Sequence, residues 1–427
     1  MEQGKSPQSE NGSGGSGIDA GNRPLDWRLS TIIAVAPFMV QLSSILDNDF
    51  YKFTMQQCVV KLFPKAKARY QFINRGKHAF PNGFAEALQA SVDAMAALKL
   101  SKEEKNWFAE TCPYLDPVYL DFLHGYCYDP SEVKIKQNGD ALDVSVEGYW
   151  YRTILWEVPL LCLISENFYK LQSAARDSDE KIVHKTIGKM KGYDELNVNI
   201  AEFGTRRRFS FHVHQLVVQT LKQYGKPFVG TSNVHLARIT NTKPIGTHAH
   251  EWFMFHAAKY GFKMANTMAL ENWIDVYRGE LGIALSDTFT TKEFYEIFDK
   301  KFARLFDGVR HDSGDPIAFA DQTIAHYKKL GIDPLSKTII FSDSLNYKKV
   351  AAIANHCKGK IGFSFGIGTN FSNDAGLRPM NIVIKMTEAL PQSEPWTKVV
   401  KLSDEPAKYT GDKESIALAK AVLEIKD

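Results

Sequence analysis

Two histidines and a carboxylate gather in residues 246–252, GTHAHEW, where His248 and His250 stand one residue apart and Glu251 follows directly. An H-x-H pair at the end of a barrel strand can begin a divalent metal site. A single histidine can instead act as a base, or as a nucleophile that accepts a phosphoryl group, when a nearby carboxylate orients its other nitrogen. A Zn-dependent hydrolase would need further ligands, and only His311 stands at the end of another expected strand. Both alternatives are open at this point.

Three further stretches offer groups that bind phosphates or carboxylates. Residues 205–208, TRRR, place three guanidinium groups in a row, and such groups grip these anions with paired N–H donors. Residues 364–370, SFGIGTN, resemble a loop whose backbone N–H groups meet a phosphate. Arg310 and Asp312 precede a glycine turn, and Asp343 follows the next apolar run. A cation for phosphate, with carboxylates for ribose hydroxyls or Mg²⁺, suits a phosphorylated sugar.

These groups stand directly after short apolar runs. From about Asn199 onward eight such runs recur, each followed by a helical pattern: NIAEFG, PFVGTS, PIGTHA, GIALSD, DGVRHD, TIIFSD, IGFSFG and NIVIKM. Strands that alternate with helices indicate βα units and a parallel sheet, and their number favours a barrel over an open sheet. The chemistry of such a barrel lies at the carboxyl ends of its strands, which is where the histidines, arginines and aspartates fall.

The other parts of the chain show different patterns. Residues 1–22 are rich in Gly and Ser and have almost nothing to bury, so we expect a disordered tail. Residues 23–165 mix helical and strand patterns and predict an α+β domain, which includes a helix capped by residues 47–49. The barrel is assigned to residues 166–400. Residues 401–427 are expected to pack on the N-terminal domain.

The composition excludes several classes of protein. Apolar residues make up 44% of the chain and charged residues 24%, and no apolar run approaches the roughly 18 residues that a membrane span requires. The net charge of +3, from 52 Lys and Arg against 49 Asp and Glu, is too balanced for a nucleic-acid-binding protein. The chain shows no signal-peptide pattern, and its five cysteines form no C-x-x-C pair. We therefore expect a cytoplasmic protein with reduced thiols that binds neither nucleic acids nor membranes.

An ordered set of strings resembles the nicotinate phosphoribosyltransferase family, whose members are type II phosphoribosyltransferases. The strings are LDNDFYKFTM, FINR, EFGTRRRFS, GTSNVHLA, PIGTHAHEW, RHDSGDP, FSDSLN and FGIGTN, and they run in order from about Leu46 to Lys401. The resemblance implies an α/β fold in which an irregular βα barrel follows an N-terminal α+β domain. It also implies a reaction: nicotinate and phosphoribosyl pyrophosphate give nicotinate mononucleotide and pyrophosphate, driven by ATP hydrolysis with Mg²⁺, as the first step of NAD salvage from nicotinate.

The same resemblance implies a role for each matching residue. ATP is expected to phosphorylate His250, with Glu251 as the orienting partner and His248 as a less constrained neighbour. The other implied contacts are the aromatic pair around the pyridine ring (Tyr51, Phe203), the nicotinate carboxylate (Arg206, Ser232), ribose and pyrophosphate (Arg310, Asp312, Asp343) and the 5′-phosphate (Gly368, Thr369). Mg²⁺ is expected to arrive with the substrates, and Asp312 is the protein carboxylate considered for it.

Ser232 bears on which pyridine is used. A carboxylate at this position would accept hydrogen bonds from the amide of nicotinamide and would repel nicotinate, so the serine favours the acid. Two alternatives to this enzyme are the zinc hydrolase and a noncatalytic nucleotide-binding protein that kept the phosphate loops. Whether the protein is a monomer or a homodimer is open, because Tyr51 can complete its own pocket or that of a partner subunit.

Overall fold

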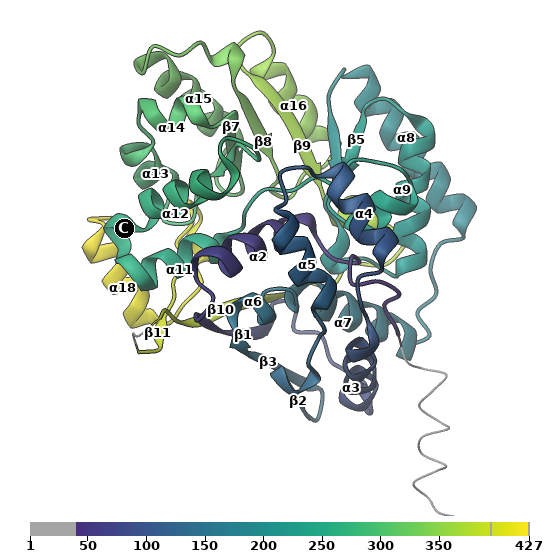
Figure 1. Cartoon of the computed structure of the whole chain (residues 1–427). Coiled ribbons are helices and arrows are strands. Elements are labelled where there is room, and N and C mark those ends of the chain that lie inside the picture. Colours follow the sequence, from purple (N-terminus) through teal and green to yellow (C-terminus); the bar gives the residue numbers. More distant parts are fainter. Residues whose placement is uncertain (1–39, 393–394, 426–427) are drawn as a thin grey trace, which may run out of the picture. The chain divides into compact units, whose positions relative to one another are not determined.

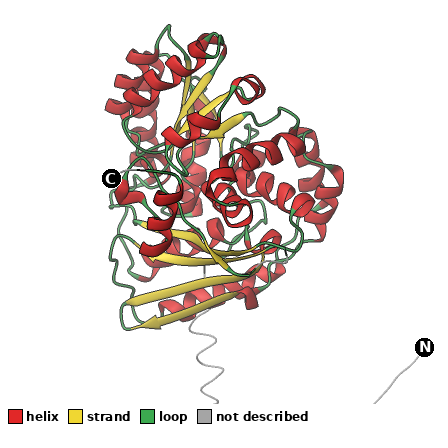
Figure 2. Ribbon diagram, turned by 90° about the vertical axis from the view of Figure 1, so that its left-hand side faces the viewer, coloured by secondary structure: helices red, strands yellow, loops and turns green. Residues whose placement is uncertain are grey.

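Two β-sheets with their helices make up the described part of the chain, which comprises residues 40–392 and 395–425 of a computed structural model (Figure 1). One sheet is antiparallel and the other is parallel (Figure 2). The expected tail, residues 1–22, lies outside the described residues, as does the start of the expected N-terminal domain. None of the described helices is both long enough and apolar enough to span a membrane.

The antiparallel sheet has the strand order β11-β10-β1-β3-β2. Its strands are β1 (Lys67–Asn74), β2 (Val133–Asn138), β3 (Ala141–Tyr149), β10 (Ile382–Leu390) and β11 (Thr397–Lys398). Strand β1 buries Ala68, Tyr70 and Phe72, because alternate side chains of a strand face the same side. The helices from this part of the chain are α2 (Phe50–Leu62), α3 (Phe84–Ala94), α4 (Lys102–Thr111), α5 (Pro117–Gly125), α6 (Trp150–Thr153) and α7 (Glu157–Leu171).

The parallel sheet has the strand order β5-β4-β9-β8-β7-β6. Its strands are β4 (Ile200–Glu202), β5 (Phe228–Thr231), β6 (Ile283–Leu285), β7 (Gly308–His311), β8 (Thr338–Phe341) and β9 (Gly362–Ile367). The helices that alternate with or follow them are α8 (Asp179–Glu195), α9 (Phe211–Tyr224), α10 (Val234–Ile239), α11 (His250–Tyr260), α12 (Phe262–Tyr277), α13 (Thr291–Ile297), α14 (Lys300–Leu305), α15 (Pro316–Lys329), α16 (Tyr347–Cys357), α17 (Thr369–Ser372) and α18 (Lys413–Val422). The expected mixed α/β fold with a parallel sheet is confirmed.

Six of the eight apolar runs form strands of the parallel sheet, and the other two do not. The PIGTHA run forms no described strand and contributes only Pro244, which makes an isolated bridge with Thr231. Proline has no N–H to give to a strand ladder, and helix α11 begins shortly afterwards at His250. The NIVIKM run forms β10, which pairs antiparallel with β1 in the other sheet. The NIVIKM strand therefore lies in the antiparallel sheet and not in the parallel one, because alternation predicts a strand but not its sheet.

Residues 243–248 lie between the two edge strands of the parallel sheet without forming a ladder. The Thr231 N–H at the end of β5 donates to the Lys243 carbonyl at 3.2 Å. On the far side, the Leu285 N–H of β6 donates to His248 Nε2 at 3.0 Å. The Ile245 N–H also donates to the Thr231 carbonyl at 2.9 Å, so this segment connects β5 to β6 through two backbone hydrogen bonds on one side and one on the other.

The C-terminal segment contacts loops that follow the parallel strands. Asp404 accepts hydrogen bonds from the backbone and hydroxyl of Thr291, which begins α13. Glu405 accepts one from the N–H of Gly314, in the loop after β7. Residues 401–427 thus reach the loops that follow the parallel strands, because those loops leave backbone donors that the two acidic side chains can satisfy.

Candidate active site

The carboxyl ends of the parallel strands bring the expected functional residues to one edge of the sheet. Parallel strands point the same way, so the residues that follow them share that edge. Phe203 follows β4 and Ser232 follows β5, whereas Asp312 follows β7 and Gly368 follows β9. Helices α2, α7 and α11 begin near these ends and supply the remaining side chains.

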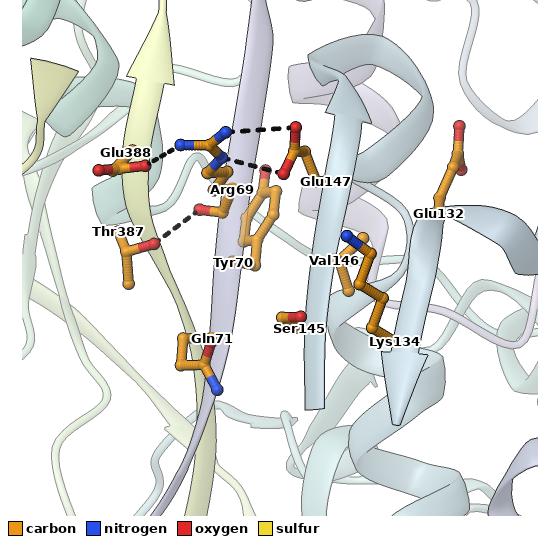
Figure 3. Close-up of a pocket in the computed structure, with 10 residues that line it drawn as sticks. All are labelled: Arg69, Tyr70, Gln71, Glu132, Lys134, Ser145, Val146, Glu147, Thr387 and Glu388. Atoms are coloured by element: carbon orange, nitrogen blue, oxygen red, sulfur yellow. Dashed lines mark hydrogen bonds and ion pairs between the residues drawn. The ribbon is translucent and has the colours of Figure 1, made fainter. Parts of the chain in front are cut away.

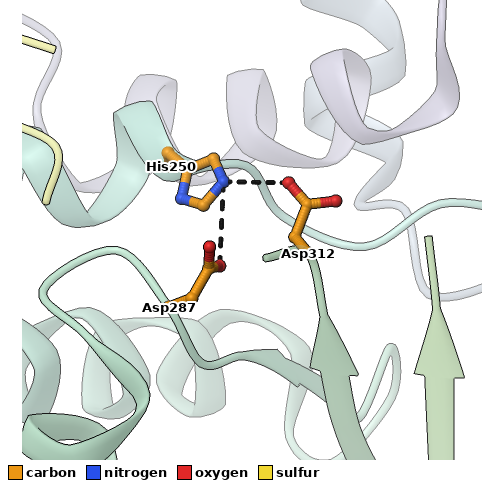
Figure 4. A group of neighbouring side chains, drawn as sticks. All are labelled: His250, Asp287 and Asp312. Carbon is orange, nitrogen blue, oxygen red and sulfur yellow. Dashed lines mark hydrogen bonds and ion pairs between the residues drawn. The ribbon is translucent and has the colours of Figure 1, made fainter. Parts of the chain in front are cut away.

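His250 is the first residue of α11 and lies beside two carboxylates, those of Asp287 and Asp312 (Figure 4). Its Nδ1 lies 3.0 Å from the hydroxyl of Thr288, and its Nε2 lies 3.1 Å from Asp312 Oδ2. Asp287 Oδ1 lies 3.8 Å from the same Nε2. A proton on Nε2 lets the ring donate to Asp312 and accept from the Thr288 hydroxyl at Nδ1. Two loops, after β6 and β7, therefore orient one buried imidazole.

The electrostatics of this group keep the imidazole uncharged. Burial and the charge of Lys401 lower the pKa of His250 to about 4, because Asp287 and Asp312 oppose only part of their effect. Burial alone would raise the pKa of the Asp312 carboxyl, but Arg310 and the hydrogen bond from His250 hold it well below its usual range. A neutral histidine beside an ionised carboxylate is the arrangement that a nucleophilic imidazole needs.

Arg310 forms the other wall of the same group. Its guanidinium donates to Asp312 Oδ1 at 3.2 Å, to the Ser342 hydroxyl at 3.1 Å and to the Thr247 hydroxyl at 3.0 Å. Ser342 also donates to Asp312 at 2.7 Å. Groups after β7, after β8 and in residues 243–248 therefore fix the direction of the Arg310 side chain. A guanidinium held in this way suits a phosphate, which it can meet with paired donors.

The residues expected around the pyridine lie at the start of α2 and after β4. Tyr51 follows Asp49 by two residues, and Asp49 lies 3.8 Å from Arg206, so Tyr51 lies in the surroundings of Arg206 in the same chain. Burial and Glu157 raise the pKa of the Tyr51 hydroxyl, and the charge of Arg206 opposes them. Phe203 lies against β9, where a Cβ on Gly366 would come within 2.3 Å of its ring, so only glycine leaves room for it. Gly246 likewise lets its loop approach the backbone nitrogen of Tyr51.

Ser232 and Arg206 meet a carboxylate that the sequence did not reveal. The Ser232 hydroxyl donates to Asp49 Oδ1 at 2.6 Å, and Arg206 Nε lies 3.8 Å from Asp49 Oδ2. Burial raises the pKa of Asp49, and the hydrogen bond from Ser232 and the charge of Arg206 offset only part of this. Arg206 is still about 40% exposed, so its guanidinium remains accessible to a substrate carboxylate.

Glu202 holds the backbone beneath this pocket and was missed by sequence reasoning. It is fully buried, and it accepts hydrogen bonds from the Gly204 N–H at 2.5 Å and from the Thr231 hydroxyl at 2.6 Å. One carboxylate thus fixes the turns after β4 and β5, which carry Phe203 and Ser232. An acidic residue inside an apolar run, AEFG, was the available signal, because a carboxylate is rarely buried without a specific partner.

Three further cations, Arg75, Arg207 and Lys385, add positive charge to that of Arg206. Burial, Arg206 and Arg75 lower the pKa of Arg207 to about 10. Burial also lowers the pKa of Lys385 to about 8, with Arg206, Lys401 and Arg75 adding to the effect and Glu157 opposing it. Among the described residues, no carboxylate lies within ion-pair distance of Arg75, Arg207 or Lys385. The structure therefore gathers positive charge that a polyanionic substrate would neutralise. Sequence reasoning missed Lys385 because it was assigned to a barrel strand.

Asp343 and the Gly368 turn lie at the neighbouring strand ends. Asp343 pairs with Lys408 of the C-terminal segment at 2.8 Å. Thr369 begins the short helix α17, and a Cβ on Gly368 would approach the Phe203 carbonyl to 3.1 Å. These contacts leave Asp343 and the turn at the same edge as Asp312, as the motif order predicted.

Two details expected for the histidine stretch are corrected. Glu251 does not orient His250: it accepts a hydrogen bond from Lys52 at 2.5 Å, because consecutive residues of a helix do not face each other. His248 is not loosely held but fully buried, and burial lowers its pKa to about 3. Within the described ranges, the metal-binding side chains that come together are His250, Asp287 and Asp312. The zinc hydrolase built on His248, His250 and His311 is therefore unsupported.

A separate pocket of about 270 Å³ lies on the antiparallel sheet (Figure 3). Arg69 crosses it and is already paired, with Glu147 at 3.0 Å and with Glu388 at 2.6 Å. The same guanidinium stacks on the Trp396 ring at 4.0 Å. Because its central cation is satisfied, this pocket is not a candidate anion site.

Comparisons with known proteins agree with this geometry. A model of the nicotinate phosphoribosyltransferase (NAPRTase) family matches residues 198–427, and a model of that family's N-terminal domain matches residues 46–165. A nicotinate phosphoribosyltransferase of Chromohalobacter salexigens is 62% identical over 383 residues, which cover 90% of this chain and 98% of that protein. One of Desulforapulum autotrophicum is 50% identical over 385 residues, covering 90% and 99%.

Solved structures point the same way. The crystal structure of nicotinate phosphoribosyltransferase from Porphyromonas gingivalis matches with a TM-score of 0.88 and 44% identity, covering 90% of this chain and 100% of that one. The enzyme from Vibrio cholerae matches with a TM-score of 0.84 and 34% identity, covering 90% and 94%. The chain therefore belongs to the nicotinate phosphoribosyltransferase family, as its motifs predicted.

Proposed function

We propose that this enzyme joins nicotinate to phosphoribosyl pyrophosphate, giving nicotinate mononucleotide and pyrophosphate, and that ATP hydrolysis through a phosphohistidine drives the reaction. In the transfer step the pyridine nitrogen forms a bond to C1′ of the sugar while the bond from C1′ to the pyrophosphate oxygen breaks. The observation that carries the proposal is the neutral, doubly oriented His250 beside the Arg310 and Asp312 pair.

His250 receives the γ-phosphoryl group of ATP in this proposal. The lone pair of the uncharged ring forms a bond to the γ-phosphorus while the bond from that phosphorus to the oxygen of the leaving ADP breaks. Thr288 holds Nδ1 in place, and Asp312 holds Nε2 and can accept the ring proton. The phosphate adds about two negative charges at the wall of the pocket. That charge alters the affinity for the anionic substrate and product, so the histidine acts on binding and does not attack the sugar.

The transfer itself needs positioning and charge stabilisation. An oxocarbenium-like sugar with a departing pyrophosphate requires groups that fix both reactants and neutralise the leaving group. Arg310, Asp312 and Asp343 are proposed to hold the ribose and pyrophosphate, and Gly368 with Thr369 the 5′-phosphate. The cations around Arg206 supply the positive charge that a pyrophosphate or triphosphate would meet.

Mg²⁺ fits the carboxylates of the same group. Carboxylate oxygens are the ligands this ion prefers, and Asp287 Oδ1 is a buried oxygen without a hydrogen-bond partner. Asp312 and Asp287 are the residues proposed to hold the ion, which would neutralise phosphate charge when bound. Ser286, through its hydrogen bond to the Arg310 carbonyl at 2.9 Å, keeps the two loops together.

The pyridine is proposed to lie between Tyr51 and Phe203, with its carboxylate toward Arg206 and Ser232. Because Tyr51 lies in the surroundings of Arg206 of its own chain, one chain supplies the whole pocket in this proposal, whether the protein is a monomer or a homodimer. We also propose that residues 243–248 close the parallel sheet into an irregular barrel, on the strength of the hydrogen bonds they make to both edge strands.

The test is product formation by the purified protein with nicotinate, phosphoribosyl pyrophosphate and Mg²⁺, with and without ATP. We expect nicotinate mononucleotide by chromatography, formed faster with ATP, and loss of the ATP stimulation in His250→Asn. The matched control is His212→Gln, because His212 is exposed on α9 and pairs with Asp179, away from the site. Binding of both substrates without product, in folded protein, would favour a noncatalytic nucleotide-binding protein. Full ATP stimulation in His250→Asn would remove the phosphohistidine from the proposal.

A further inference from the structure

A buried ion cluster lies directly behind the active site. Lys52 is fully buried, and its ammonium donates to Glu157 Oε2 at 2.6 Å and to Glu251 Oε1 at 2.5 Å. A buried ammonium is costly unless carboxylates surround it, so the three side chains must stay together. They come from the first turns of three helices, α2, α7 and α11. One lysine therefore fixes the relative positions of three helix ends.

Both ends of this cluster reach functional side chains. Glu251 is the residue after His250 at the start of α11, so the two cannot move independently. Glu157 uses its second oxygen, Oε1, for Arg206, whose Nη1 lies 3.5 Å away. The contacts therefore run without a gap from Glu251 through Lys52 and Glu157 to Arg206.

The charges along this path are shared and not paired one to one. One ammonium serves two carboxylates, and one of those carboxylates also serves a guanidinium. Burial would raise the pKa of Glu157, yet Lys52 and Arg206 lower it to about 2, so this carboxylate stays charged. Glu251 Oε2 is buried and has no hydrogen-bond partner. Any charge added beside Glu251 therefore changes how Lys52 divides its attraction between the two acids.

We propose that Lys52 is a positioning residue that transmits the phosphorylation of His250 to Arg206 through Glu251 and Glu157. The inference rests on the proposed function. A phosphate on His250 draws the Lys52 ammonium toward the start of α11, which leaves Glu157 with more uncompensated charge for Arg206. Arg206 is then held more firmly in one direction, and the nicotinate carboxylate meets a guanidinium that is already ordered. This path gives a physical route from ATP use to nicotinate affinity.

The experiment measures the KM for nicotinate with and without ATP in the full-length enzyme and in Glu251→Gln. Glutamine keeps the shape and an acceptor for Lys52 but removes one charge. In Glu251→Gln we expect the ratio of the KM without ATP to the KM with ATP to be at least threefold smaller than in the unaltered enzyme, and so closer to 1. Phosphohistidine should still form on His250. The control is Glu104→Gln, whose carboxylate is also buried but contacts Ser44. It should leave the ratio unchanged.

A second variant separates transmission from simple support. Glu251 and Arg206 share no direct contact, so Glu251→Gln combined with Arg206→Lys should change the KM ratio by less than the product of the single effects if the path is real. Independent effects would overturn the proposal, as would a wild-type ratio in Glu251→Gln or a loss of phosphohistidine in that variant. If the unaltered enzyme makes product but shows no ATP effect on KM, the transmission fails while the transferase stands. If it makes no product, the proposed function fails first and the transmission falls with it.

Discussion

Lowering the pH from 7.5 to 5.5 should leave His250, the proposed phosphoryl acceptor, uncharged. Burial and Lys401 lower the pKa of His250 to about 4, against an ordinary value of about 6.5. At pH 5.5 an ordinary histidine is neutral in roughly one molecule in ten, whereas a pKa of about 4 leaves more than about nine in ten neutral. The structure thus predicts roughly a tenfold difference in the reactive form at that pH.

The assay is a titration by ¹H–¹⁵N nuclear magnetic resonance of histidine-labelled protein, with the His250 signal assigned from His250→Gln. We expect a midpoint near 4. The amount of phosphohistidine formed with ATP, measured after the reaction is quenched in alkali, should not fall between pH 7 and 5.5 through protonation of His250. Lys401→Met should move the midpoint upward, because it removes the charge that disfavours the imidazolium. A midpoint between 6 and 7 in the unaltered protein would refute the reasoning.

The same shift predicts how stability depends on pH. The pKa of His250 in the folded state lies below its value in the unfolded chain, so the unfolded state binds the proton first as the pH falls. The stabilisation is present above about pH 6.5 and is lost as the pH falls toward 4, and a shift of this size corresponds to a change on the order of 3 kcal/mol. Denaturant unfolding at pH 7 and pH 4.5 measures it, with His250→Gln as the comparison.

Two further predictions concern specificity and phosphate binding. Ser232→Asp should lower kcat/KM for nicotinate more than tenfold, because it places a second carboxylate beside Asp49 and competes for Arg206; unchanged kcat/KM would sink the assignment of Ser232 to the nicotinate site. Lys385 has a pKa lowered to about 8 by burial and neighbouring cations, so it loses its charge as the pH rises through that value. The KM for phosphoribosyl pyrophosphate should therefore rise between pH 7.5 and 9, and Lys385→Met should have a higher KM that no longer shows this step.

Much of the fold could be predicted because apolar runs and strand-end chemistry are local. Strands β4 to β9 all fall on expected runs, and the helix expected after residues 47–49 begins at Phe50, although the Asp49 side chain makes no capping hydrogen bond and instead accepts from Ser232. The placement of β10 could not be predicted, because its partner β1 lies more than 300 residues earlier in the chain. Alternation gives the exposed and buried faces of a strand, whereas its neighbour depends on packing of the whole chain.

The residues of the site also divide into those that a local sequence pattern reveals and those whose role depends on distant parts of the chain. Strand-end position correctly selected Arg310 and Asp312, which belong to the end of β7. His250 was selected by the same rule although the run before it forms no strand, and the structure brings it into hydrogen-bond contact with Asp312. Lys52 and Glu202 were not selected, because a lysine on a helix and a glutamate in a short strand are ordinarily solvated. Their burial depends on partners such as Glu251, 199 residues away from Lys52, which no local pattern reveals.

The start of α11 explains why two charge networks meet in this enzyme. Consecutive helical residues point about 100° apart, so His250 and Glu251 face different neighbours although they adjoin in sequence. His250 joins the phosphate side, where Asp312 and Arg310 follow β7, and Glu251 joins Lys52 behind the pyridine side. A charge placed on the first residue must therefore act on both sides at once, which is what coupling of ATP to nicotinate affinity requires.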